Sequence, residues 1–228
     1  MFLTIVCLTS LNELNLCFNY QMKYFSIFLL VLFSLLSCKK KKVDFVLTGT
    51  ITETTFNGNL TGATVKLYQV PVGSVSEVLL GSAVLGSDGK YSFTFPREKM
   101  EKYILRISKS GYFDLVKTVY FSELSVSSDN VRNYSTTAKS WVKLTFHNLN
   151  PLPGDHLTFI KQSGKEGCAE CCTDAQYDFY GALDTSIYCI NDGNTIYSYF
   201  YNVMGTADQG IMSATTVAFD TTEIVLNY

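Results

Sequence analysis

Four cysteines in the C-terminal half of the chain are the residues whose types and spacing point most directly to chemistry. They are Cys168, Cys171, Cys172 and Cys189. Four thiolates suit a tetrahedral zinc site, but zinc ribbons use two paired knuckles and this segment offers one. In an exported chain an even number of cysteines favours disulfides. A bond between the neighbours Cys171 and Cys172 would be strained. We therefore predict that Cys171 and Cys172 form disulfides with Cys168 and Cys189, and that these bonds attach the loop of residues 162–176 to the rest of its domain. We expect no metal.

Side chains suited to acid–base or nucleophilic catalysis are scarce. The chain has two histidines, His147 and His156, and we expect both at the surface. The sequence has no glycine-rich phosphate loop, HExxH motif or EF-hand spacing. Two carboxylate pairs lie at short spacing, Asp174 with Asp178 and Asp184 with Asp192. They would suit calcium binding or glycoside hydrolysis, but carboxylates in β-turns are usually turn formers, so we predict no catalytic residue and no cofactor.

Tyrosines form the most suggestive pattern for ligand binding. Tyr197, Tyr199 and Tyr201 share one face of an expected strand. Tyrosines on nearby segments are Tyr177, Tyr180 and Tyr188. An exposed stripe of this kind would stack against sugar rings or an apolar partner surface. The alternative is that these rings pair across strands within the sheet or pack beneath the cysteine loop. Solvent exposure of the stripe separates the two interpretations.

The N-terminal region has the features of a secretory signal. Met22 and Lys23 precede a 13-residue apolar run, residues 24–36, which is too short to span a bilayer as a stable helix. The tetrapeptide Leu-Leu-Ser-Cys at residues 35–38 resembles the lipobox of bacterial lipoproteins. The resemblance implies cleavage before Cys38 and attachment of lipid to its thiol. Other interpretations are an ordinary signal peptide or a short transmembrane anchor.

Residues 1–21 precede this signal, lack a basic opening and carry a separate apolar stretch. We therefore predict that translation begins at Met22, and that leader and signal peptide together occupy residues 1–37. The lipidated cysteine and a basic tether would follow at residues 38–43. The lysines at positions 39–42 would each gain about 1 kcal/mol beside an anionic leaflet, or would act as a solvated spacer.

The charge balance excludes one class of partner. The formal net charge is −2, and residues 43–228 carry 13 basic against 19 acidic side chains. Nucleic-acid binding requires clustered basic side chains on the folded body, so we expect no nucleic-acid partner. Lipoproteins of the Bacteroidota that travel to the cell surface often carry acidic residues after the lipidated cysteine. Lysines stand there instead, so the resemblance implies an outer-membrane anchor with the periplasmic face favoured.

From residue 43 onward, apolar residues recur with a period of two in short runs separated by Gly, Asn and Asp. This pattern is typical of an all-β sandwich. The length fits two small β-sandwich modules, at residues 44–121 and 140–228, joined by a polar closing segment and linker at 122–139. In the first module we expect strands at 44–54, 63–70, 78–85, 90–95, 102–109 and 115–121, with the only candidate helix at 97–102. In the second module we expect a strand opening at residue 140 and others at 156–161, 177–183, 186–191, 195–204, 210–218 and 222–228.

The first module contains four short motifs in a characteristic order. They are Gly-Thr-Ile at residues 49–51, Leu-Thr-Gly-Ala-Thr-Val-Lys-Leu at 60–67, Asp-Gly-Lys-Tyr-Ser-Phe at 88–93 and Ile-Ser-Lys-Ser-Gly-Tyr at 107–112. This order resembles the carboxypeptidase regulatory-like domain, a transthyretin-like seven-stranded sandwich. The third motif is a tight turn followed by Tyr91 and Phe93, which we expect to point inward. Such domains are accessory modules without catalytic residues, so the resemblance implies a scaffold or binding role.

These features together predict a lipid-anchored cell-envelope protein with a non-catalytic binding or structural role. Its expected partners are the membrane and an envelope protein or a glycan. Two alternatives stay open at this point. One is carbohydrate capture through the tyrosine stripe, and the other is an envelope hydrolase with converging carboxylates.

Overall fold

Apolar residues at alternate positions place both halves of the chain in β-structure. The computed structural model describes residues 43–168 and 170–228. Within these ranges the regular elements are strands and one short 3-10 helix, η1 (Phe121–Glu123). The predicted all-β fold with two small β-sandwiches is therefore confirmed. The predicted signal peptide, Cys38 and the lysines at 39–42 lie outside the described residues. In the part that is described, no helix is long and apolar enough to cross a bilayer.

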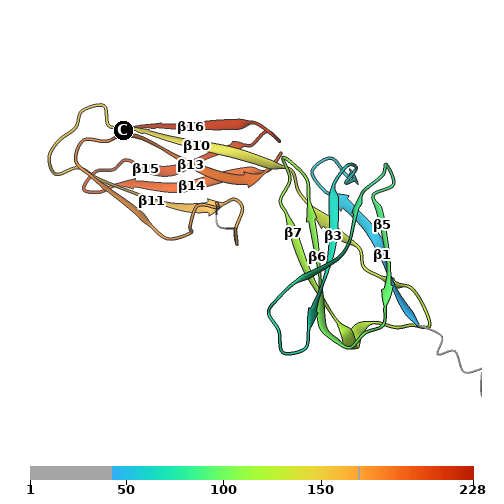
Figure 1. Cartoon of the computed structure of the whole chain (residues 1–228). Coiled ribbons are helices and arrows are strands. Elements are labelled where there is room, and N and C mark those ends of the chain that lie inside the picture. The colour runs from blue at the N-terminus through green and yellow to red at the C-terminus, as the bar shows by residue number, and fades with distance from the viewer. Residues whose placement is uncertain (1–42, 169) are drawn as a thin grey trace, which may run out of the picture. The chain divides into compact units, whose positions relative to one another are not determined.

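The first sandwich is formed by two sheets, which Figure 1 draws from blue to yellow-green. Its strands are β1 (Asp44–Glu53), β2 (Gly58–Asn59), β3 (Thr64–Pro71), β4 (Val78–Val84), β5 (Lys90–Pro96), β6 (Met100–Ser108), β7 (Leu115–Tyr120), β8 (Asn130–Val131) and β9 (Tyr134–Thr136). One sheet has the order β2-β1-β5, with β8 and β9 also paired to β1, and the other has the order β4-β3-β6-β7. Side chains from the facing sheets fill a single core.

Strand β1 shows how the sequence builds this core. Its burial alternates strictly from Phe45 onward, so that Phe45, Leu47 and Ile51 face the opposite sheet. The ring of Phe45 packs against the rings of Phe95 and Tyr103 at centroid distances of 5.8 and 6.5 Å. This is the period-two pattern that the sequence predicts for a strand with one buried face.

The turn before β5 also agrees with the sequence. Gly89 has a φ of 64°, a left-handed conformation that favours glycine. The Lys90 N–H donates a hydrogen bond to Asp88 Oδ1 at 3.1 Å, which closes the turn. Tyr91 and Phe93 are buried as expected.

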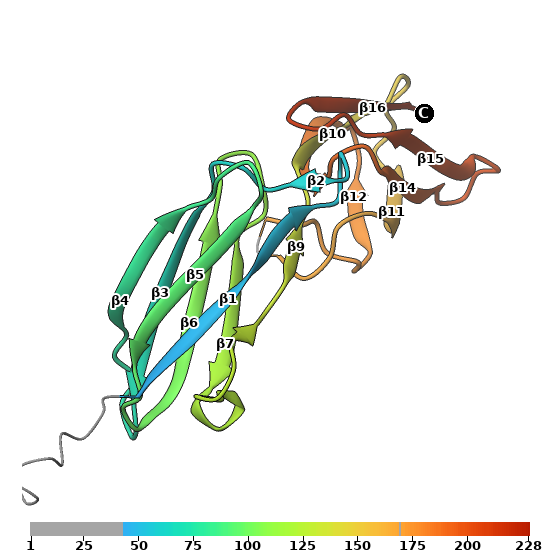
Figure 2. The same ribbon diagram turned by 90° about the vertical axis from the view of Figure 1, so that its right-hand side faces the viewer.

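The segment at 122–139 differs in part from its prediction. It was expected to be a closing segment and linker; β8 and β9 run parallel to β1 and complete its sheet, which agrees with a closing segment, so most of it belongs to the first sandwich rather than to a linker. Figure 2 shows β1 lying between β5 and β9. The side chain of Asn130 donates hydrogen bonds to Val46 O and Ser125 O, both at 2.9 Å. The segment is polar and joins the sheet through backbone and amide hydrogen bonds. A search for alternating apolar residues does not detect strands that pair in this way.

The helix expected at 97–102 is also wrong. Residues 97–99 have no regular structure, and β6 begins at Met100, where it pairs with Pro71 of β3. A polar stretch of this length makes too few hydrogen bonds to nucleate a helix, and pairing with an existing strand is the better alternative.

The second sandwich follows β9 after two residues and is drawn from yellow to red in Figure 1. Its strands are β10 (Lys139–His147), β11 (His156–Ser163), β12 (Tyr177–Tyr180), β13 (Asp184–Asp192), β14 (Ile196–Val203), β15 (Gln209–Thr215) and β16 (Thr221–Asn227). One sheet has the order β13-β10-β16 and the other β12-β11-β14-β15. Phe146 and Phe159 stack in its core at 5.1 Å. Both sandwiches belong to one unit of the structure, Asp44–Tyr228.

Gly49 generates a testable prediction for the first sandwich. A Cβ at this position would overlap Arg132 O, the carbonyl that also accepts a hydrogen bond from the Tyr91 hydroxyl at 2.7 Å. Gly49→Ala should push the segment of β8 and β9 away from β1 and reduce the free energy of unfolding by about 1–3 kcal/mol. Urea denaturation measures this loss. The control is Gly58→Ala in β2, where the nearest contact of a Cβ is Glu53 Oε1 at 3.4 Å. An equal loss in both variants would contradict the overlap as its cause.

Candidate functional site

The cysteine loop, residues 164–176, connects β11 to β12 and contains three of the four cysteines. Disulfides join Cys168 to Cys171 and Cys172 to Cys189. The predicted disulfides are thus confirmed, and this is one of the pairings that the sequence left open. The first bond closes a short ring within the loop. The second attaches the loop to β13, because Cys189 points into the core of the second sandwich.

A buried lysine that the sequence analysis missed also holds the cysteine loop. Lys161 follows Leu157 and Phe159 in the buried register of β11, and its side chain is only 3% exposed. Its ammonium group donates to Lys165 O at 3.0 Å and Cys172 O at 2.9 Å. It also forms an ion pair with Asp174 at 2.6 Å. A charge in this position requires several partners, and the loop supplies all three. The signal in the sequence was a lysine at an inward position of an alternating strand.

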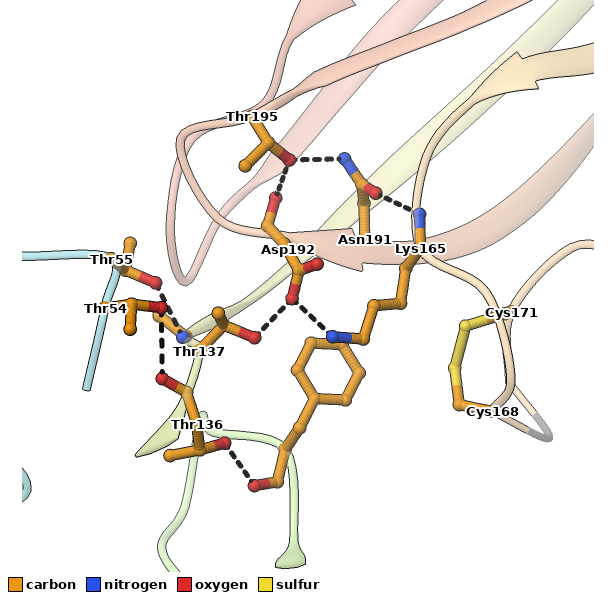
Figure 3. A network of polar contacts seen from close by, with 12 residues as sticks. Thr54, Thr55, Thr136, Thr137, Lys165, Cys168, Cys171, Asn191, Asp192 and Thr195 are labelled. Atoms are coloured by element: carbon orange, nitrogen blue, oxygen red, sulfur yellow. Dashed lines mark hydrogen bonds and ion pairs between the residues drawn. A yellow bond between two sulfur atoms is a disulfide. The ribbon is translucent and has the colours of Figure 1, made fainter. Parts of the chain in front are cut away.

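A polar network centred on Asp192 lies where the chain passes from the first sandwich to the second (Figure 3). We call it the Asp192 network. The Asp192 carboxylate at the end of β13 accepts hydrogen bonds from the Thr137 hydroxyl and, at 2.8 Å, from Lys165 Nζ. The neighbouring Asn191 accepts a hydrogen bond from the Lys165 backbone N–H at 2.7 Å. Thr137 lies between β9 and β10, so one carboxylate ties the connection, the cysteine loop and β13 together.

The connection itself is also bonded to the first sandwich. The hydroxyl of Thr136 donates to Phe113 O at 2.6 Å, and the Ala138 N–H donates to Thr55 Oγ1 at 2.9 Å. Lys165 adds a cation–π contact, because its ammonium lies 4.3 Å from the centroid of the Phe113 ring. These contacts leave the two-residue connection little freedom to act as a flexible linker.

Phe219, in the turn between β15 and β16, is the apolar counterpart of this network. Its ring packs against Phe56 at 5.9 Å and Tyr112 at 5.4 Å, both from the first sandwich. Its φ of 67° is rare for a bulky residue and costs conformational energy. A Cβ on Gly111 would lie 2.9 Å from the Phe219 ring, so glycine is required for this close approach. The strained backbone therefore positions a ring at the contact between the sandwiches.

A shallow polar groove of about 660 Å³ lies beside this contact, lined by residues that include Lys109, Asp114 and Lys139. Both lysines have aromatic partners. Lys109 Nζ lies 4.5 Å from the Tyr112 ring centroid, and Lys139 Nζ lies 5.4 Å from that of Phe113. The groove is open to solvent, and its two lysines contact the rings of Tyr112 and Phe113.

The tyrosine stripe is not exposed, and the prediction that it forms a ligand face is wrong. Tyr197 is 1% exposed and Tyr199 is fully buried, and burial raises the pKa of both hydroxyls well above the ordinary value. The Tyr199 ring packs against Phe146 at 5.9 Å. Tyr201 is partly buried, and its hydroxyl donates to Asp208 at 2.9 Å. Tyr197 and Tyr199 face the opposite sheet, where they form part of the core of the second sandwich.

The histidines and carboxylates singled out in the sequence do not meet in one place. His147 contacts Asp184 at 2.8 Å and His156 contacts Asp178 at 2.7 Å, while Lys161 and Lys165 form ion pairs with Asp174 and Asp192. Asp184 and Asp192 lie at opposite ends of β13, about 25 Å apart along an extended strand. Within residues 43–168 and 170–228, no group of three or more His, Cys, Asp or Glu side chains is arranged to hold a metal ion.

The exposed aromatic side chains of the second sandwich include two on its other sheet. Trp141 of β10 is 37% exposed and Tyr188 of β13 is 63% exposed. The sequence analysis did not select Trp141, and it grouped Tyr188 with the buried stripe. The signal that was available is the alternation in β10, where Trp141 occupies an outward position between the buried Ser140 and Val142.

Comparisons with known proteins identify no family for this chain. No family model and no curated protein matches it, so the resemblance of the first module to the carboxypeptidase regulatory-like domain stays a prediction. Among solved structures, the chain is similar to the shaft pilin SpaA from Lactobacillus rhamnosus GG, with 10% identity over 82% of this chain and 98% of that chain and a TM-score of 0.31.

Two further similarities are of the same order. The minor pilin GBS52 from Streptococcus agalactiae has 11% identity over 80% of this chain and 94% of that chain, with a TM-score of 0.33. The 3-chlorocatechol 1,2-dioxygenase from Rhodococcus opacus 1CP has 11% identity over 44% of this chain and 62% of that chain, with a TM-score of 0.29. Similarities at this level support no argument about function.

The two disulfides should differ in their effect on stability. Replacing Cys172 and Cys189 together with alanine frees the cysteine loop from β13 and should reduce the free energy of unfolding by about 3 kcal/mol, because this bond closes 17 residues. The bond between Cys168 and Cys171 joins residues only 3 positions apart, so replacing both with alanine should reduce the free energy of unfolding by less, about 2 kcal/mol. Chemical denaturation of both double variants measures the difference, and the reverse order would contradict the assigned roles.

The Asp192 network also makes a prediction about stability. Asp192→Ala removes the acceptor of two hydrogen bonds and leaves the Lys165 ammonium without its carboxylate, so we expect a loss of about 2 kcal/mol in the free energy of unfolding. The matched control is Asp114→Ala, an exposed aspartate with no ion pair among the described residues, which should change stability by less than about 0.5 kcal/mol. Thermal and urea unfolding monitor both variants. A loss at Asp192 no larger than that at Asp114 would show that the network contributes nothing.

Proposed function

We propose that the chain is a lipid-anchored, non-catalytic component of the bacterial cell envelope, in which two coupled β-sandwiches act as binding or scaffold modules. The observation that carries the structural role is the Asp192 network. One carboxylate joins the cysteine loop, β13 and the connection to the first sandwich. Contacts of this kind suit a protein that has to keep two modules together outside the cytosol.

The absence of a shared catalytic centre in the described residues supports the same proposal. A hydrolase of the kind considered from the sequence needs two carboxylates on opposite sides of one cleft. Here each of the four predicted carboxylates contacts a different histidine or lysine, in four separate pairs. Each of these pairs links neighbouring strands or holds the cysteine loop, which is a structural use of the charge.

The anchor is proposed from the sequence at residues 24–38. An apolar run that ends in Leu-Leu-Ser-Cys is the pattern expected before a lipidated cysteine. The two disulfides support an oxidising location, because such bonds persist mainly in exported proteins. We propose that the lipid holds the protein at the outer membrane, with the periplasmic face favoured by the lysines at 39–42.

Metabolic labelling with palmitate tests the anchor. In a bacterium with an outer membrane, the wild-type chain should incorporate labelled palmitate and sediment with the outer membrane. Cys38→Ala should abolish incorporation, because no thiol is left to carry the lipid. Cys17→Ala is the matched control, since Cys17 lies in the segment predicted to be removed, and it should leave labelling unchanged. Persistent labelling of Cys38→Ala, or a wild-type protein found in the cytosol, would refute the proposal.

A further inference from the structure

The outward face of the sheet β13-β10-β16 carries an arrangement that the structural role does not explain. We call it the Trp141 face. Strand β10 contributes Trp141, Lys143 and His147, together with Thr145, which has the same register but is itself buried. The register places Tyr188 of β13 directly opposite Lys143, and therefore diagonal to Trp141. The two exposed rings thus lie on adjacent strands, and Lys143 neighbours both of them.

Polar groups beside the rings are held in position by hydrogen bonds across three strands. Glu223 of β16 accepts a hydrogen bond from the Thr145 hydroxyl at 2.6 Å and another from Lys143 Nζ at 2.9 Å. The hydroxyls of Thr145 and Ser186 are 3.1 Å apart. Thr145 itself is buried, whereas the Ser186 hydroxyl, the Glu223 carboxylate and the Lys143 ammonium keep hydrogen-bonding capacity towards solvent. A ligand with several hydroxyl groups would find them already oriented.

The charges of Lys143 and Glu223 on the Trp141 face cancel each other. The hydrogen bond with Glu223 raises the pKa of Lys143, and those with Thr145 and Lys143 lower the pKa of Glu223, so both groups stay charged as a pair near neutral pH. Further along β10, His147 pairs with Asp184 at 2.8 Å. A highly anionic ligand would therefore find no excess of positive charge to bind, so nucleic acid is disfavoured.

The mixture of rings and paired charges also argues against a protein partner. The centre of a stable protein interface is apolar and depleted of charged residues. On the Trp141 face, Lys143 neighbours both rings, because it lies two residues from Trp141 along β10 and directly opposite Tyr188, and its pairing with Glu223 would have to be desolvated. A pyranose ring fits better, because it has an apolar face of C–H groups that stacks on an aromatic ring and hydroxyl groups at its rim that bond to polar neighbours. Trp141 and His147 span about 20 Å along β10, which favours an extended chain of sugars over a single one.

We propose that the Trp141 face binds a neutral polysaccharide, with Trp141 and Tyr188 stacking on sugar rings and the row of Lys143, Glu223 and Ser186 bonding to hydroxyl groups. This inference goes beyond the proposed envelope role and does not depend on the lipid anchor. It also differs from the tyrosine stripe considered from the sequence, because it uses the opposite sheet and residues that are exposed.

The chain contains a single tryptophan, so its fluorescence reports directly on this face. The full-length protein, purified from whichever cell fraction contains it, is titrated with neutral hexasaccharides derived from cellulose, mannan and starch. At least one should shift or quench the emission of Trp141 in a saturable manner, with a Kd that does not depend on salt. Tyr188→Ala should raise this Kd at least about fivefold. Calorimetry should show the same or a larger loss for Trp141→Ala, which lacks the reporter.

Tyr180→Ala is the matched control. Tyr180 is 70% exposed, but it lies on β12 in the other sheet and stacks on His156 at 4.2 Å. Its substitution should leave the Kd unchanged, and circular dichroism verifies that all variants fold. The proposal is overturned if none of the three hexasaccharides binds, if Tyr180→Ala weakens binding as much as Tyr188→Ala, or if only an acidic hexasaccharide of galacturonic acid binds in a salt-dependent way. A failure of palmitate labelling would refute the lipid anchor but would not affect saccharide binding by the Trp141 face, so each proposal is tested separately.

Discussion

The carboxylate of Asp192 is the point at which the separate parts of the described chain meet. It lies at the end of β13 and accepts hydrogen bonds from Thr137, in the connection between the sandwiches, and from Lys165, in the cysteine loop. The same lysine then contacts the ring of Phe113 in the first sandwich. Because each partner comes from a different segment, this carboxylate restrains three segments that would otherwise move independently. The ring of Phe219 adds an apolar contact at the cost of an unfavourable φ.

The cysteine loop depends on a second interior charge. Lys161 occupies a position where the alternation of β11 calls for an apolar side chain, and the loop supplies two carbonyl oxygens and Asp174 as its partners. The disulfide between Cys172 and Cys189 then fixes the loop to the core. Covalent and electrostatic contacts therefore act on the same segment, and the loop that they order is the one that presents Lys165 to Asp192.

The two sheets of the second sandwich use their aromatic residues in opposite ways. In the sheet that contains β14, Tyr197 and Tyr199 face inward and pack with the core phenylalanines. In the sheet that contains β10, Trp141 and Tyr188 face outward beside paired charges. The inward rings stabilise the fold by burial, whereas the outward rings and the polar groups beside them give the surface both apolar and hydrogen-bonding character.

The sequence by itself determined the β-class, the division into two sandwiches, most strand positions and the presence of disulfides, because alternation, turn residues and cysteine number are local properties. Tertiary structure decided which face of a strand is buried: the same alternation describes Tyr199 and Trp141, and only the position of the opposing sheet separates core from surface. It also decided the pairing of Cys172 with Cys189, the pairing of β8 and β9 with β1, and the meeting of Thr137, Lys165 and Asp192. These contacts join residues far apart in the chain, and no local pattern encodes which distant backbone or side chain will lie opposite.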